Sequence, residues 1–185
     1  MGTPATIDRR TLLYAFGIAS IGSLLPAKTI SGGQVVVTRP GEGRFSYSTD
    51  ELRKTSYCKV TSEDSGGVCS IFAIVARPRS GPPAHVHHRE NEWYHVISGE
   101  FLFKSGDKPY TIPTGGSIWL PREIPHVWAN PTNSEAKLLL VCQPGGFEKF
   151  FDEMGKAIVD KQSPTQMEQI MHKYGMETVG PPVFP

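Results

Sequence analysis

Three histidines and two glutamates lie within the short stretch "HVHHRENE", residues 85–92. Alternate side chains of a β-strand point to the same face, so His85 and His87 would project together while His88 would point away. Two imidazoles at this spacing can bind one divalent metal ion. Glu92 follows a turn and can return a carboxylate oxygen toward the same point. This glutamate favours a metal site over a solvated, histidine-rich loop.

Two sequence motifs resemble those of the cupin superfamily, and they occur in the same order as in that family. The motifs are His85-x-His87-x4-Glu92-x6-Gly99 and Gly115-x5-Pro121-x-Glu123-x2-His126-x3-Asn130. Two positions depart from the family pattern. Gly81 lies closer to the first histidine than the usual glycine does, and Glu123 replaces a glycine, a change that affects a turn rather than the metal. The resemblance covers roughly residues 65–145.

The resemblance implies that four residues bind one metal ion inside a small β-barrel: His85, His87, Glu92 and His126. Three neutral imidazoles and one carboxylate suit Fe, Mn, Ni, Cu or Zn, and they leave one or two positions for substrate or dioxygen. Most structural zinc sites use cysteines and are closed, which favours a catalytic site here. The spacing does not distinguish among these metals.

Short segments rich in β-branched and aromatic residues fill the middle of the chain, and turn residues such as Gly66-Gly67 and Gly115-Gly116 separate them. The expected strands are 56–60, 68–76, 84–88, 93–97, 100–104, 110–112, 117–120, 126–130 and 136–142. Strands at this regular spacing predict an all-β fold. With the resemblance, we expect a small antiparallel β-barrel of the cupin type, a double-stranded β-helix or jelly roll.

Helical periodicity appears only after the last expected strand. One face of residues 147–158 carries Phe147, Phe150, Phe151 and Met154. A second helix begins with Ser163 as its N-cap and Pro164 in its first turn, and it ends at Gly175. The run "PGGFE" before the first helix resembles the single-domain quercetinase-like cupins, in which this tail packs over the barrel.

The first 27 residues differ in composition from the rest of the chain. Arg9-Arg10 precede "TLLYAFGIASIGSLLPA", a stretch of moderate hydrophobicity that resembles a twin-arginine signal for export. Retention of residues 1–27 as a structural arm, in a cytoplasmic protein, is the alternative, and Leu25 at the expected cleavage point supports it. The stretch is too short and too rich in Gly and Ser to predict a stable membrane anchor.

These patterns divide the chain into four expected parts. They are a signal in residues 1–27, an N-terminal arm with edge strands in 28–55, the barrel in 56–145 and a C-terminal helical extension in 146–185. The net charge of +1 and the lack of a stripe of basic residues give no electrostatic support for a nucleic-acid partner, so none is expected. The sequence leaves open whether the protein forms a homodimer.

The three cysteines, Cys58, Cys69 and Cys142, lack the spacing of a zinc knuckle. Cys58 and Cys69 flank a turn, so they could form a disulfide in an exported protein. The alternative is that all three are small buried apolar residues.

Strand parity also predicts which other side chains face the interior. Tyr94 shares parity with Glu92, and Phe101, Phe103 and Trp128 are further candidates for a substrate pocket. Plain core packing is the alternative for these aromatic residues. The remaining polar residues receive structural interpretations: His88 and His95 point away from the site, Asn130 belongs to a turn, and Glu90 and Glu100 are solvated charges.

The resulting functional hypothesis is a mononuclear metal-dependent dioxygenase that acts on a phenolic or enolic small molecule with O2. A quercetinase-like flavonol 2,4-dioxygenase is its sharpest form. In that resemblance Glu92 is both a metal ligand and the general base. Two alternatives stay open, because a fold does not determine a reaction. They are a metal-dependent isomerase, lyase or cyclase that does not use O2, and a non-catalytic small-molecule-binding protein.

Overall fold

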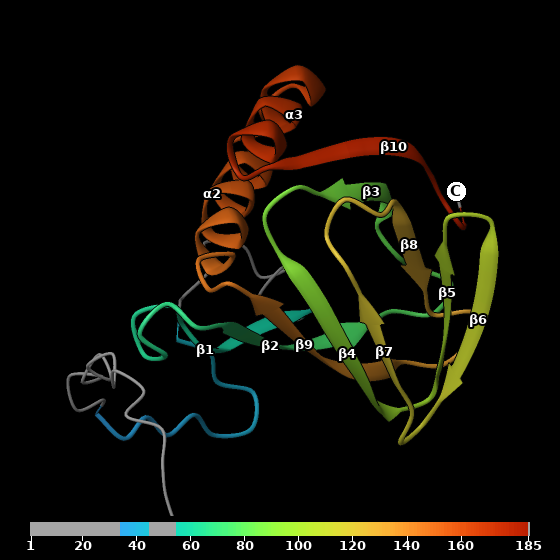
Figure 1. Ribbon diagram of the computed structural model, residues 1–185, viewed down its shortest axis with the longest axis horizontal. Coiled ribbons are helices and arrows are strands. Elements are labelled where there is room, and N and C mark those ends of the chain that lie inside the picture. The colour runs from blue at the N-terminus through green and yellow to red at the C-terminus, as the bar shows by residue number, and fades with distance from the viewer. Residues whose placement is uncertain (1–33, 45–54, 185) are drawn as a thin grey trace, which may run out of the picture. The chain divides into compact units, whose positions relative to one another are not determined.

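The computed structural model describes residues 34–44 and 55–184, and its strands form two five-stranded antiparallel sheets (Figure 1). The first sheet has the order β1 (Ser56–Val60), β2 (Ser70–Ala76), β9 (Ala136–Gln143), β4 (Asn91–Ser98) and β7 (Ser117–Leu120). The second sheet has the order β10 (Met176–Pro182), β3 (Pro83–His87), β8 (His126–Ala129), β5 (Glu100–Ser105) and β6 (Lys108–Pro113). The contacts group all of these elements into one compact unit.

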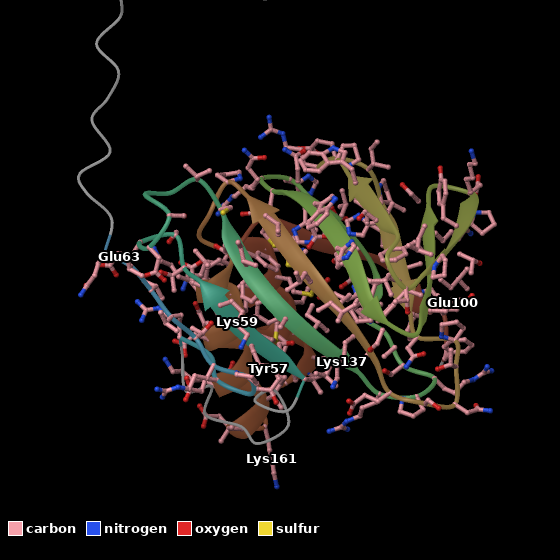
Figure 2. The ribbon with its side chains drawn as sticks, turned by 90° about the horizontal axis from the view of Figure 1, so that it is seen from below. Tyr57, Lys59, Glu63, Glu100, Lys137 and Lys161 are labelled. Carbon is pink, nitrogen blue, oxygen red and sulfur yellow. The ribbon has the colours of Figure 1, made fainter. Side chains whose placement is uncertain are left out.

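Burial alternates along the central strands of the first sheet, β2, β4 and β9. One face of these strands packs inward, and Phe72, Leu138 and Leu140 join Phe101 and Phe103 of the second sheet in one core. Figure 2 views the first sheet from below, with Tyr57 and Lys59 on β1 and Lys137 on β9. The predicted all-β cupin fold is confirmed, as two facing sheets of a jelly roll rather than as a closed barrel.

Two helices follow β9, as the sequence predicts: α2 (Glu148–Val159) and α3 (Pro164–Lys173). Ser163 caps α3, where its side chain accepts a hydrogen bond from the backbone of Gln166. The apolar face of α2 packs on the first sheet, since the rings of Phe151 and Phe72 lie 4.8 Å apart. Figure 1 shows both helices on one side of the sheets, with β10 running from α3 along β3.

The C-terminal extension is not wholly helical, which corrects the prediction for residues 146–185. After α3 the chain forms β10, which pairs antiparallel with β3, and Met176 and Thr178 lie opposite His87 and His85. The prolines at the end of β10 are tolerated because this strand lies at the edge of the second sheet. The tail therefore supports the strand that carries two of the predicted metal ligands.

The predicted signal, residues 1–27, lies outside the described residues, as does most of the predicted N-terminal arm. The part of that arm that is described, residues 34–44, forms no strand, so the expected edge strands are absent from it. Cys58, Cys69 and Cys142 are free thiols, and Cys58 and Cys142 are fully buried. Within residues 34–44 and 55–184, no helix has the length and apolar character needed to cross a bilayer.

Candidate metal centre

The four predicted ligands come together from both sheets. His85 and His87 lie on β3 and His126 lies on β8, where it is directly opposite His85. Glu92 comes from β4 of the facing sheet. The inward direction of His85 and His87 follows from their two-residue spacing, and pairing of β3 with β8 adds the third imidazole. The site therefore forms only when the two sheets face each other.

The geometry of this quartet is close to that of a single-ion site. One donor atom from each residue lies within 4.8 Å of the others, and all four residues are buried. Ligand atoms bonded at about 2.0–2.2 Å to one ion lie up to about 4.4 Å apart. The rings of His85 and His126 have centroids 4.6 Å apart, and those of His87 and His126 stack at 5.6 Å. Small side-chain adjustments would bring all four donors onto one ion.

The outward nitrogen of each imidazole faces an acceptor, and in His85 and His126 a hydrogen bond to it fixes the ring. His85 Nδ1 lies 2.7 Å from the Pro83 carbonyl oxygen, and His126 Nδ1 lies 3.1 Å from that of Ile124. These acceptors favour the tautomer with a proton on Nδ1, which leaves Nε2 free to bind a metal. His87 Nδ1 lies 3.6 Å from a carboxylate oxygen of Glu90 instead.

Glu92 is 2% exposed and lies among the imidazoles. Its Oε2 is 2.9 Å from His126 Nε2 and accepts a hydrogen bond of 3.0 Å from the Tyr94 hydroxyl, while Oε1 is 3.4 Å from His87 Nε2. Burial by itself would raise the pKa of this carboxyl group, but His87 and His126 outweigh burial and lower the pKa to about 2. Glu92 is therefore an anion near neutral pH, as a metal ligand must be.

The histidines respond differently to the same surroundings. Burial lowers the pKa of His85 to about 4, which keeps its imidazole neutral and able to bind a metal. Burial opposes the charged form of His87 as well, but the carboxylates of Glu92 and Glu90 overcome it and raise the pKa of His87. Burial and the nearby carboxylates thus act on the imidazole pKa in opposite directions, and burial prevails at His85 whereas the carboxylates prevail at His87.

Two observations show that the residues fit a metal ion. His87 Nε2 is buried without a hydrogen-bond partner, although it points toward Glu92. A buried polar atom without a partner is costly, and a cation at this point would satisfy it. The donor set of three imidazoles and one carboxylate suits a divalent transition metal. The quartet could therefore hold such an ion, whose identity the donor set leaves open.

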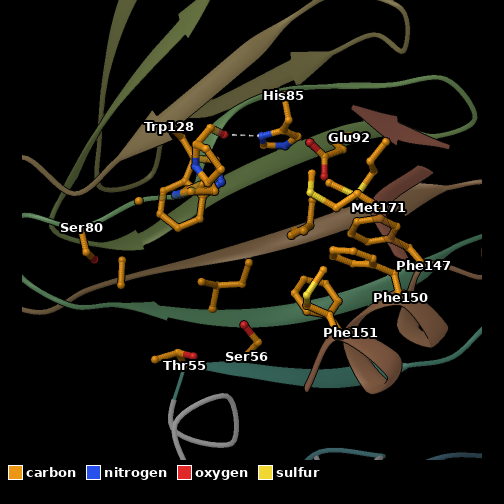
Figure 3. Close-up of a pocket in the computed structure, with 18 of the residues that line it drawn as sticks. Thr55, Ser56, Ser80, His85, Glu92, Trp128, Phe147, Phe150, Phe151 and Met171 are labelled. Carbon is orange, nitrogen blue, oxygen red and sulfur yellow. Dashed lines mark hydrogen bonds between the residues drawn. The ribbon is translucent and has the colours of Figure 1, made fainter. Parts of the chain in front are cut away.

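A cavity of about 640 Å³ opens beside the quartet (Figure 3). His85, His87 and Glu92 line it together with Tyr94 and Trp128. Apolar side chains from the start of α2, from both helices and from β10 complete the lining: Phe147, Phe150, Phe151, Met154, Met167, Met171 and Met176. Figure 3 shows Phe147 and Phe150 beside Glu92, with Trp128 on the far side of His85. The size and apolar lining match sites for small organic molecules.

The predicted pocket residues divide into two pairs. Tyr94 and Trp128 line the cavity, and Tyr94 donates a hydrogen bond to Glu92. Phe101 and Phe103 do not line it, because both are fully buried in the core behind these residues. His88 and His95 point away from the site as predicted, toward Glu123 and Ser117 respectively.

Two polar residues behave differently from their sequence interpretation. Asn130 does anchor a turn, but it is fully buried, and its amide donates to the carbonyl oxygens of Ala76, Arg77 and Ser134. The prediction that Glu90 is a solvated charge is wrong. It is only 8% exposed and lies against His87. No strand periodicity applies in the turn that carries Glu90, so the sequence held no signal for its burial.

Comparison with known proteins agrees with this fold. Residues 74–142 match the family model described as "Cupin domain". A Hypocrea virens protein named "Probable oxidoreductase virH" is 31% identical over 119 residues, which cover 60% of this chain and 53% of that protein. "Protein SchB" from Streptomyces halstedii is 26% identical over 86 residues, 46% of this chain and 62% of that protein. The chain thus matches only between half and two thirds of the length of these relatives.

Among solved structures, a predicted oxalate decarboxylase from Thermotoga maritima superposes with a TM-score of 0.46. Its sequence is 21% identical, and the match covers 48% of this chain and 78% of that one. The family match spans the strands from β2 to β9, including all four residues of the quartet. Over residues 74–142, this chain is therefore similar in sequence to the cupin domain family.

Proposed function

We propose that this protein is a metal-dependent oxygenase that acts on a phenolic or enolic small molecule with O2, in the manner of a quercetinase-like dioxygenase. One observation carries the proposal: the buried quartet of His85, His87, Glu92 and His126 opens onto a large, mostly apolar cavity. A purely structural metal would not require such a cavity. The name of the Hypocrea virens relative, an oxidoreductase, supports the redox class.

A divalent transition metal bound by the quartet would supply Lewis-acid and electron-transfer chemistry at the inner end of the cavity. The apolar lining from α2 and α3 would bury a flat aromatic substrate and exclude water around it. Trp128 and Phe147 lie on either side of the ligands, where they can contact an aromatic ring. These side chains would place a hydroxyl group of the substrate next to Glu92.

Glu92 would take the proton from that hydroxyl group. An enolic or phenolic group must lose its proton before its ring can give up an electron, and a carboxylate within hydrogen-bond reach can accept it. The Tyr94 hydroxyl, which donates to Glu92 Oε2, would hold the carboxylate in place. Burial, with the carboxylate of Glu92 adding to it, raises the pKa of Tyr94 well above its usual value, so Tyr94 stays a hydrogen-bond donor at neutral pH.

Oxygen consumption tests the proposal. Metal-free protein is loaded with each of Fe, Mn, Ni, Cu and Zn in turn and mixed with a panel of flavonols and simpler enolic phenols in an oxygen electrode. We expect O2 uptake in step with substrate loss for at least one redox-active metal, and no uptake by the metal-free protein. Substrate conversion without O2 uptake would contradict the proposal in favour of an isomerase or lyase, and substrate binding without conversion would favour a non-catalytic protein.

A further inference from the structure

The three histidines of the quartet differ in what stands behind them. His85 and His126 each have Nδ1 next to the backbone carbonyl oxygen two residues earlier in the chain. For His87 the outward nitrogen faces the side chain of Glu90, in the turn between β3 and β4. Among the three histidines, His87 alone has a charged side chain next to its outward nitrogen. That side chain belongs to Glu90, which lies outside the quartet.

The contact between His87 and Glu90 joins two unsatisfied atoms. His87 Nδ1 and Glu90 Oε2 are both buried without a hydrogen-bond partner, and they lie 3.6 Å apart. This distance is slightly too long for a hydrogen bond, and a small side-chain rotation would complete one. A buried carboxylate oxygen that lacks a hydrogen-bond partner is costly, so the fold must gain elsewhere from keeping Glu90 Oε2 in this place.

The position of Glu90 excludes it as a direct ligand of the same ion. His87 Nε2 faces Glu92 at 3.4 Å, whereas Nδ1, on the other side of the ring, faces Glu90. An ion bound at Nε2 therefore lies across the imidazole from Glu90. A carboxylate in this place orients a metal-binding imidazole and makes it a stronger donor, because it accepts the Nδ1 proton.

We propose that Glu90 is a positioning residue for the metal centre: it holds the His87 ring with its proton on Nδ1 and strengthens Nε2 as a ligand. The inference rests on the metal site of the proposed function but not on the reaction. Glu90 also adds a second carboxylate, on the side of the His87 ring opposite Glu92, so the two together carry enough negative charge to compensate a divalent cation. His85 and His126, backed by neutral carbonyl groups, would bind more weakly as individual donors.

Zinc binding tests this inference without reference to activity. The affinity of metal-free protein for Zn²⁺ is measured by chelator competition for the wild type, Glu90→Leu, Glu90→Gln and Glu168→Gln, a control at an exposed glutamate of α3. We expect Glu90→Leu to lose roughly 10–100-fold in affinity, the range for partners of this kind. Glu90→Gln should lose less, because its amide oxygen can still accept the Nδ1 proton, and Glu168→Gln should match the wild type.

A second readout separates positioning from a general structural effect. NMR of the zinc-loaded protein records the imidazole nitrogen and proton signals of the three histidines. In Glu90→Gln, which keeps the shape of the turn, we expect the His87 Nδ1–H signal to move and those of His85 and His126 to stay.

Equal zinc affinity in the wild type and Glu90→Leu, or equal shifts at all three histidines, would overturn the role of Glu90. Failure of the wild type to bind Zn²⁺ would overturn the metal centre itself. Zinc binding that depends on Glu90, in a protein without O2 uptake, would support the inference and contradict only the oxygenase.

Discussion

Glu92 and Glu148 are each 2% exposed, but their surroundings differ. Both oxygens of Glu148, at the start of α2, accept hydrogen bonds from neutral donors: the Ser62 backbone and hydroxyl, the Ser70 hydroxyl and the Gly146 backbone. Glu92 lies instead among imidazoles, one of which keeps a buried nitrogen without a partner. Burial of a carboxylate alone therefore does not mark a functional site. A functional site is indicated instead by surrounding polar groups that find no hydrogen-bond partner within the fold.

The two carboxylates should accordingly fail in different ways when they are changed. Glu148 joins the start of α2 to residues at the beginning of β2 and in the turn before it, so its loss should weaken the fold. Under the proposed function, Glu92 lies where a metal ion and a substrate would bind, so its loss should weaken the chemistry.

The largest effect is expected for Glu92→Gln. The amide keeps the shape and one oxygen donor but cannot accept a proton, so turnover per bound metal should fall by roughly 10²–10⁴-fold, the range for a positioned base. Turnover by fully loaded wild-type and variant protein provides the measurement. Glu148→Gln is the matched control and should keep wild-type turnover per folded molecule. Agreement between Glu92→Gln and the wild type within a few-fold would reduce Glu92 to a ligand.

Glu148→Gln should instead lower stability. The substitution replaces a charged acceptor of several hydrogen bonds by a neutral amide, and hydrogen bonds to charged groups contribute about 1.5–3 kcal/mol each. We expect a loss of about that size in the free energy of unfolding, measured with urea on metal-free protein. Glu168→Gln, at an exposed position, should change it by less than about 0.5 kcal/mol. A Glu148 variant as stable as this control would show that the bonds of Glu148 do not hold α2.

The contribution of Glu148 should also depend on pH. Burial would raise the pKa of Glu148, but the hydrogen bonds from Ser62 and Ser70 outweigh it and lower the pKa. A lowered folded-state pKa gives stability that is present above the unfolded value, about 4.3, and lost as pH falls through the folded value. The stability difference between the wild type and Glu148→Gln should thus be constant near pH 7 and shrink below about pH 4. A difference that grows on acidification would contradict this assignment.

The smallest effect concerns Glu123, in the second motif, which contacts neither carboxylate. Its backbone has φ = 65°, in the left-handed region that glycine favours, so the turn keeps the conformation for which the family uses glycine. Glu123→Gly and Glu123→Ala both remove the exposed contact with His88. The glycine variant should be more stable than the alanine variant by about 1 kcal/mol, measured by urea unfolding. Equal stabilities would mean that this turn relaxes in the alanine variant.

The sequence allowed prediction of the strands up to β9, of both helices and of the quartet, because these depend on local patterns and on motif spacing. It did not allow prediction of β10, since "VGPP" contains a glycine and two prolines that argue against a strand. Only pairing with β3 reveals that this segment forms an edge strand. Local pattern and tertiary pairing conflict there, and tertiary pairing prevails.

The burial of Glu90 and Glu148 was likewise not predictable. The burial of Glu90 depends on its position against His87, and that of Glu148 on serines more than seventy positions earlier in the chain, such as Ser70. Phe101 and Phe103 show a different limit of prediction from sequence. Strand parity places them inside, but it does not tell the core from the cavity wall.

The most direct test of the account is the zinc-dependent stability of four proteins: the wild type, His126→Ala, Glu148→Gln and His95→Ala, a control at a histidine outside the quartet. Thermal unfolding of each metal-free protein is followed with and without Zn²⁺. A metal bound only by the folded state stabilises that state by about 2.7 kcal/mol at 100 times its Kd. We predict one Zn²⁺ per chain and a clear rise in Tm for the wild type, His95→Ala and Glu148→Gln, the last from a lower starting value. His126→Ala should show little or no rise, and a rise equal to that of the wild type would contradict the metal centre.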